Sequence, residues 1–145
     1  MKEGRGRNNF LAGRKILIAE DDDSSFYLLE FMLEMFGAEI IHTETGEDTI
    51  QTLVDNPDIS LIFMDIRMPG MNGFETTRKI REFNADVLII AQTALMLKDD
   101  EKKKVLEAGC NDYILKPIDQ DLLLQKIKQL VITLELAEAQ NLKKR

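Results

Sequence analysis

The chain has 145 residues, which is long enough for one domain with a hydrophobic core and too short for two of ordinary size. Apolar residues make up 44% and charged residues 31%, a balance that excludes an intrinsically disordered protein. The formal net charge of −7 disfavours nucleic-acid binding, because contacts with phosphate groups need a basic surface. The single cysteine excludes an internal disulfide and favours a cytoplasmic setting, and no apolar run is long enough for a membrane span.

Apolar, β-branched runs predict five strands, at residues 15–19, 38–43, 60–65, 86–91 and 112–115. The runs are continuous rather than alternating, which is typical of strands covered on both faces. Helical spacing of apolar residues predicts helices at residues 26–36, 50–54, 74–81, 98–108 and from 119 onward. Strands that alternate with helices need crossover connections, so we expect a five-stranded parallel sheet with helices on both faces. We expect the domain over residues 13–132, after a flexible leader (1–12) and before a helical tail or linker (133–145).

Polar side chains stand at the carboxyl ends of these predicted strands. They follow or end the first, third, fourth and fifth strands, and they are Glu20 and Asp21, Asp65, Thr93 and Lys116. In open parallel sheets, ligands bind at this edge, where the order of the strands reverses. We therefore expect these five side chains to form one site.

Three converging carboxylates repel one another unless a cation lies among them. Hard oxygen ligands without histidine or cysteine select Mg²⁺, for which Mn²⁺ can substitute. The ammonium of Lys116 and the hydroxyl of Thr93 are suited to bind the oxygens of a phosphoryl group. A metal, a lysine and a hydroxyl around a carboxylate indicate phosphoryl transfer, with the central carboxylate as the nucleophile that becomes an aspartyl phosphate.

Four stretches together carry a family resemblance: EDD after ILIA, FMDIRMPGMNGFE (63–75), IIAQTA (89–94) and AGCNDYILKPI (108–118). In this order and spacing they resemble the receiver domain of two-component response regulators. The last two stretches are most similar to the receivers of hybrid sensor histidine kinases. The resemblance implies a flavodoxin-like (βα)5 doubly wound sandwich, in agreement with the alternation of predicted strands and helices.

The resemblance also implies which residues bind the metal and accept the phosphoryl group. Asp65 is the implied phosphoacceptor, and the implied Mg²⁺ ligands are Glu20, Asp21, Asp65 and the backbone carbonyl of Arg67. Where a pair of aspartates is common in the family, this chain has Glu20 and then Asp21. Glutamate is longer by one methylene and still reaches the metal, directly or through water. A cis peptide is implied at Lys116–Pro117.

Further implied roles concern the phosphoryl group after transfer. Thr93 and Lys116 are implied to contact it, and Thr93 and Tyr113 are implied to form a conformational switch. The alternative for Tyr113 is plain packing with its hydroxyl at the surface. Arg67 and Leu95 are both large and stand near the path of water to the phosphoryl group, which predicts slow self-hydrolysis.

These implications define a signalling module of a two-component phosphorelay that catalyses its own phosphorylation and dephosphorylation. A histidine kinase or a histidine phosphotransfer domain is the implied donor. We expect the module in the cytoplasm, or in the cytoplasmic part of a membrane-bound hybrid kinase, without direct contact to nucleic acid or membrane. The alternatives are a stand-alone single-domain response regulator, a degenerate receiver that serves as a scaffold, and an aspartate-nucleophile phosphatase of the haloacid dehalogenase class. That class needs a second aspartate two residues after the nucleophile, where this chain has Arg67.

Other polar or reactive residues are expected to have structural roles only. Asp22 and Asp23 are expected at the surface, where Asp23 or Ser24 caps the next helix. His42, the single histidine, is expected to be structural, because it lies within a strand and away from the site edge. Cys110 is expected to be a small buried hydrophobe.

The tail suggests a possible weak homodimer. Its apolar residues are spaced alternately by four and three, as in the seam of a short coiled coil: Leu123, Ile127, Leu130, Leu134 and Ala137. The alternative is that the first three pack onto the sheet and the rest of the helix frays.

Overall fold

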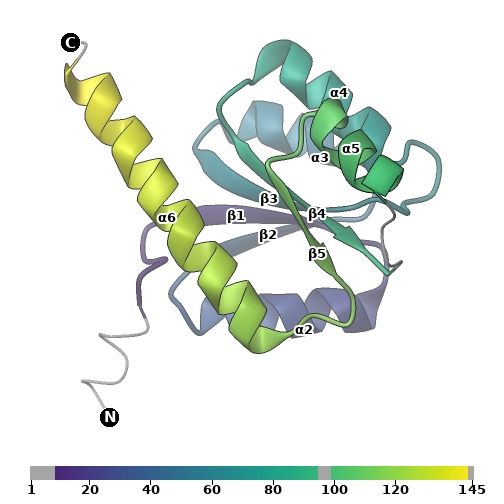
Figure 1. Ribbon diagram of the computed structural model, residues 1–145, viewed down its shortest axis with the longest axis horizontal. Helices are drawn as coiled ribbons and strands as arrows, with labels where there is room; N and C mark the ends of the chain where they lie inside the picture. The colour runs from purple at the N-terminus through teal and green to yellow at the C-terminus, as the bar shows by residue number, and fades with distance from the viewer. Residues whose placement is uncertain (1–8, 95–98, 144–145) are drawn as a thin grey trace.

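The computed structural model describes residues 9–94 and 99–143, in which strands and helices alternate (Figure 1). The strands are β1 (Lys15–Ala19), β2 (Glu39–Thr43), β3 (Ile59–Asp65), β4 (Leu88–Thr93) and β5 (Asp112–Leu115). The helices are α2 (Asp23–Glu34), α3 (Gly46–Asp55), α4 (Gly73–Phe83), α5 (Asp99–Ala108) and α6 (Gln120–Lys143). Every predicted strand and helix is present, with shifted ends. Lys98, the predicted start of α5, lies outside the described residues.

The described strands form one parallel sheet in the order β2-β1-β3-β4-β5, which confirms the predicted flavodoxin-like doubly wound sandwich. The chain passes from β1 to β2 on one side of β1, and from β3 to β4 in the opposite direction along the sheet. The order of the strands therefore reverses between β1 and β3. The carboxyl ends of these two neighbouring strands therefore border the crevice where such sheets bind ligands. Ala19 pairs with Met64 in the register, so the next residues along, Glu20 and Asp65, are neighbours.

The helices form two layers, one on each face of the sheet (Figure 1). α2 and α6 cover one face, and α3, α4 and α5 cover the other. Successive residues of β1 point to opposite faces. Ile16 and Ile18 pack in the core beneath α2 and α6, whereas Leu17 and Ala19 pack in the core beneath α3, α4 and α5. Continuing this alternation by one residue directs Glu20 to the side of α2.

The cap of α2 is Asp22, and not Asp23 or Ser24 as the sequence predicted. The Asp22 carboxylate accepts a hydrogen bond of 2.8 Å from the backbone N–H of Ser25, and Asp22 has the extended backbone of a cap residue. Asp23 is instead the first residue of the helix, where a negative charge is favourable next to the positive end of the helix dipole. Both aspartates are exposed, as predicted.

The packed chain begins earlier than the predicted residue 13. Phe10 stacks on Phe36 with ring centroids 4.8 Å apart, and Leu11 is fully buried in the core beneath α2. The N–H of Leu11 donates a hydrogen bond of 2.8 Å to the carbonyl oxygen of Phe36. Gly37 then turns the chain toward β2 with a φ of +95°, a conformation that glycine adopts without strain. Phe10 and Leu11 therefore pack against the domain although they fall within the predicted leader, and residues 1–8 lie outside the described residues.

The residues of the predicted coiled-coil seam face their own domain. Leu123 and Ile127 are fully buried, and Leu130 and Leu134 pack against the same core, while Ala137 is exposed. The side chains of the predicted seam are thus largely used inside the domain.

The end of α6 continues as a helix past the sheet instead of fraying (Figure 1). Arg14, just before β1, donates two hydrogen bonds of 2.9 and 3.2 Å to the Glu138 carboxylate and so ties the tail to the domain. Within residues 9–94 and 99–143, no helix combines the length and the apolar character that crossing a membrane requires.

Candidate functional site

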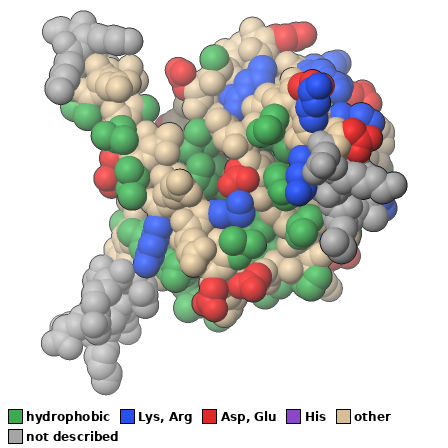
Figure 2. Space-filling view, in the orientation of Figure 1, with side chains coloured by type: hydrophobic (Ala, Val, Ile, Leu, Met, Phe, Trp, Pro, Cys, Tyr) green, Lys and Arg blue, Asp and Glu red, His purple; other side chains and the backbone are tan. Residues whose placement is uncertain are grey.

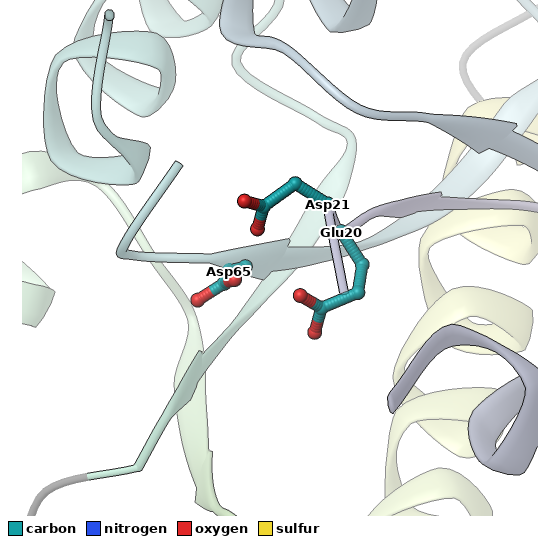
Figure 3. Close-up of side chains that lie close together, drawn as sticks. All are labelled: Glu20, Asp21 and Asp65. Atoms are coloured by element: carbon teal, nitrogen blue, oxygen red, sulfur yellow. The ribbon is translucent and has the colours of Figure 1, made fainter. Parts of the chain in front are cut away.

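Three carboxylates meet at the crevice between β1 and β3. Glu20 and Asp21 come from the loop between β1 and α2, and Asp65 is the last residue of β3 (Figure 3). One carboxylate oxygen from each lies within 4.8 Å of the others. Glu20 and Asp65 are only 1% and 5% exposed, whereas Asp21 is open to solvent. The predicted acidic site is therefore assembled, and two of its three charges are buried.

Lys116 is the cation that the chain itself supplies to this cluster. Its ammonium forms an ion pair with Glu20 and lies 3.6 Å from Oδ2 of Asp65. Its backbone N–H donates a hydrogen bond of 2.7 Å to the carbonyl oxygen of Thr93, which joins the ends of β4 and β5. The Lys116–Pro117 peptide is cis, as predicted.

One lysine does not balance the negative charge around Glu20. The pKa of Glu20 is raised to about 7, first by burial and then by hydrogen bonding to Asp65 and repulsion from its charge, while Lys116 acts in the opposite direction. A carboxyl group that resists ionisation in this way is stabilised in its charged form by an additional cation. The electrostatics thus suit a site that binds a positive ion.

The loop after β3 returns over Asp65. The N–H of Arg67 donates a hydrogen bond of 3.0 Å to Oδ1 of Asp65, and the Arg67 side chain is exposed. The N–H of Gly73 bonds the carbonyl of Ile66, and a Cβ at Gly73 would lie 2.5 Å from the carbonyl oxygen of Asp65. The sequence did not indicate that Gly73 is needed for this close approach. The contribution of the Arg67 carbonyl to a metal site stays a prediction.

The ends of β4 and β5 supply the remaining predicted residues. Thr93 is buried at the end of β4. Tyr113 on β5 is partly buried against the core beneath α3, α4 and α5, and the Lys126 ammonium lies 5.8 Å from its ring centroid. Gln92, which the sequence did not single out, pairs with Asp65 in the register, and among the described residues its buried amide has no hydrogen-bond partner. Leu95, predicted to flank the phosphoryl group, lies outside the described residues.

Two further residues were predicted to be structural. Cys110 is buried as expected, and burial raises the pKa of its thiol. His42 is partly buried against α2, but its Nε2 lies 2.8 Å from the carbonyl oxygen of Glu20. It is therefore closer to the site than its place within β2 suggested.

A doubly wound parallel sheet with an acidic cluster and a lysine at its switch point defines the chain as a receiver-type signalling domain. The family model of the response regulator receiver domain matches residues 16–128. Protein PilH of Pseudomonas aeruginosa is 36% identical over 116 residues, which cover 78% of this chain and 93% of PilH. The chain thus belongs to the receiver domain family of two-component response regulators.

Two solved structures of receiver domains are similar to this chain. The receiver domain of sensor histidine kinase PA1611 of Pseudomonas aeruginosa, with a magnesium ion in its active-site cleft, is 31% identical with a TM-score of 0.73, covering 83% of this chain and 98% of that one. The receiver domain of Ssk1, in complex with the histidine phosphotransfer protein Ypd1 of Saccharomyces cerevisiae, is 29% identical with a TM-score of 0.72, covering 79% and 86%. Several curated relatives are much longer, and the chain spans only 13% of the sensor protein GacS of Pseudomonas syringae.

Proposed function

We propose that Asp65 accepts a phosphoryl group from a phosphohistidine of a partner protein, with a divalent cation held by Glu20, Asp21 and Asp65. The observation that carries this proposal is the convergence of three carboxylates with one lysine at the crevice between β1 and β3. Asp65 is the proposed acceptor because the family resemblance implies it, and in this structure it lies 3.6 Å from the Lys116 ammonium and accepts a hydrogen bond from the backbone N–H of Arg67.

The cation that suits this site is Mg²⁺, with Mn²⁺ as a substitute. The cluster offers oxygen ligands only, which is the preference of these ions, and it has more negative charge than Lys116 balances. When bound, the cation neutralises the carboxylates and the charge of the incoming phosphoryl group. We also place the backbone carbonyl of Arg67 in the ligand set, as the family resemblance implies.

The proposed transfer is a displacement at phosphorus. A carboxylate oxygen of Asp65 forms the new P–O bond while the P–N bond to histidine breaks, and the electron pair of that bond returns to the imidazole. The N–H of Arg67, 3.0 Å from Oδ1 of Asp65, orients the carboxylate before the attack. The ammonium of Lys116 and the hydroxyl of Thr93 then bind the transferred phosphoryl oxygens. Attack by water on the same phosphorus later breaks the P–O bond to Asp65, which releases inorganic phosphate and restores the free carboxylate.

The proposed response to phosphorylation involves Thr93 and Tyr113. The hydrogen bond from the Lys116 N–H to the Thr93 carbonyl couples the lysine that binds the phosphoryl group to the end of β4. Tyr113 lies on the neighbouring β5, paired with Ala91 of β4. A shift of Thr93 toward the phosphoryl group is therefore expected to change the packing of the Tyr113 ring.

The proposed donor is a histidine kinase or a histidine phosphotransfer protein that docks on α2. Tyr27 and Phe31 of this helix are 61% and 62% exposed, although large aromatic side chains are usually covered. Figure 2 shows hydrophobic side chains beside acidic ones at the lower edge of the molecule, where α2 and the start of α6 lie in Figure 1. The complex of Ssk1 with Ypd1 supports a partner of this class. We further propose that the chain is the receiver part of a hybrid histidine kinase of the cytoplasm, rather than a stand-alone regulator. A haloacid dehalogenase-type phosphatase is disfavoured, because Arg67 stands where that class has its second aspartate.

Phosphoramidate, a small donor with a P–N bond, tests the acceptor directly. The parent protein with Mg²⁺ is expected to form a phosphoprotein that hydroxylamine cleaves, as an acyl phosphate requires, and Asp65→Asn is expected to form none. Hydroxylamine-sensitive labelling of Asp65→Asn would show that the acceptor is another carboxylate.

Docking on α2 is tested separately with phosphorylated Ypd1 as the donor. Phe31→Ala is expected to slow transfer from this protein but not from phosphoramidate. Val54→Ala, which truncates an exposed apolar side chain on α3 at the other face of the sheet, is the matched control. Equal effects of both substitutions would argue against a specific surface on α2.

A further inference from the structure

His42 holds the backbone of the residue that begins the acidic cluster. Its Nε2 lies 2.8 Å from the carbonyl oxygen of Glu20. A carbonyl oxygen only accepts hydrogen bonds, so Nε2 carries the proton and donates. The neighbouring residue of β2, Thr43, accepts a hydrogen bond of 2.9 Å from the N–H of Glu20. Two consecutive residues of β2 therefore bind both backbone groups of Glu20, one residue beyond the end of β1.

The imidazole ring is itself held in place by α2. It stacks on Phe26 with ring centroids 3.6 Å apart and an angle of 9° between the planes. Phe26 is buried, and its N–H donates to the carbonyl oxygen of Asp22, the cap of the helix. The ring therefore has one face covered by a residue that belongs to the first turn of α2. This stacking orients Nε2 toward the loop that connects β1 and α2.

The bonded carbonyl belongs to the peptide unit that links the two neighbouring acidic residues. A trans peptide is planar and includes the Cα atoms of both residues that it joins. Fixing the carbonyl of Glu20 therefore fixes the plane that contains the Cα atoms of Glu20 and Asp21. The side chains of both residues belong to the acidic cluster with Asp65. This hydrogen bond thus holds the backbone from which two of the three carboxylates extend.

We propose that His42 is a positioning residue that presets the Glu20–Asp21 peptide for binding of a divalent cation. The inference rests on the proposed function, since it assigns the cation to these carboxylates. Because the loop is already ordered in the folded protein, less conformational entropy is lost when the ion binds. Outer-shell partners of ligands commonly change metal affinity by about tenfold or more when they are removed. His42 acts here on the backbone of the ligands and touches neither carboxylate in this role.

The test compares two substitutions of similar size that differ in the N–H donor. His42→Gln keeps a donor at the position of Nε2, and His42→Met has none, while both lose the aromatic ring. Binding of Mn²⁺ alone is measured by calorimetric titration of the full chain, and thermal unfolding is measured in chelator. We expect His42→Met to bind Mn²⁺ about tenfold more weakly than the parent, and His42→Gln to recover most of this loss. A residue with a merely structural role would lower the melting temperature of both variants without separating their affinities.

Further variants distinguish the possible failures. Asp21→Asn removes a proposed ligand and is expected to weaken Mn²⁺ binding strongly. If parent and Asp21→Asn bind Mn²⁺ equally, the proposed cation site is wrong, and the role of His42 is wrong with it. If Asp21→Asn loses binding while His42→Met binds as the parent does, only the positioning role is refuted. Should His42→Met fail to fold, His42→Phe removes the donor while keeping a ring to stack on Phe26.

Discussion

Asp65→Asn is expected to stabilise the metal-free protein at neutral pH, although it removes the proposed acceptor. The pKa of Glu20 is raised to about 7 in the folded protein, and Asp65 contributes to this rise by hydrogen bonding and repulsion. A carboxyl group with a raised folded-state pKa binds more protons in the folded than in the unfolded chain. The free energy of unfolding therefore falls as the pH rises from 4.5 to about 7, and stays level above it.

The size of the effect follows from this difference in pKa. The whole rise corresponds to at most about 3 kcal/mol, and solvent at the open edge of the sheet reduces it to about 2 kcal/mol. Burial is the leading cause and is unchanged in Asp65→Asn, so the share of Asp65 is about 1 kcal/mol. For a domain of this size, that corresponds to a rise in melting temperature of roughly 4 °C.

The assay is thermal unfolding followed by circular dichroism in chelator between pH 4.5 and pH 8. Asp65→Asn is expected to melt above the parent at pH 8 and together with it at pH 4.5. Asp23→Asn, which removes an exposed charge at the start of α2, controls for the change in net charge and is expected to lack this pH dependence. A variant that is less stable than the parent at pH 8, or equally shifted at both pH values, would refute the proposed repulsion.

Three other predictions test the packing, the phosphoryl lifetime and the tail. Arg81→Ala is expected to lower the free energy of unfolding by about 3 kcal/mol in chemical denaturation, because its guanidinium donates to the carbonyls of Gly109 and Val87. Arg78→Ala, exposed on the same helix, should have little effect, and equal losses would show that these hydrogen bonds are unimportant. Arg67→Ala is expected to lose its phosphoryl group faster than the parent in a chase followed by mass spectrometry, and an unchanged rate would show that bulk at this position does not limit water. In sedimentation, the full chain and a chain ending at Ile132 are both expected to be monomers, because the residues of the predicted seam pack on their own domain. A dimer formed by the full chain alone would restore the coiled-coil interpretation.

The fold was predictable because the apolar runs, which are the strongest patterns in this sequence, form the strands of the sheet. Runs such as residues 61–64 are apolar throughout, and only a strand covered on both faces places every second side chain in each of two cores. Strand ends were less predictable where polar residues continue the pairing. β4 extends to Thr93 because Gln92 and Thr93 are buried and paired with β3 and β5, although neither is apolar.

The site was predictable to the extent that its residues stand at strand ends. Parallel topology alone brings Glu20 and Asp65 together once the order of the strands is known. Contacts that depend on side-chain direction were not predictable. Position 42 lies next to the end of the predicted strand at 38–43, and no pattern indicates that its ring reaches the carbonyl of Glu20. Leu11 was missed because it stands within a basic, glycine-rich segment that shows no pattern of a buried element, although its side chain is buried in the core.

The most direct test of the proposed phosphoacceptor is the intact mass of the protein after incubation with acetyl phosphate. The parent with Mg²⁺ is expected to gain one phosphoryl group, and to gain none when the metal is chelated. Asp65→Asn is expected to gain none under either condition, and thermal unfolding of the same sample checks that the variant is folded. Uptake of phosphate by Asp65→Asn at the same stoichiometry as the parent would place the acceptor elsewhere and contradict this account of the site.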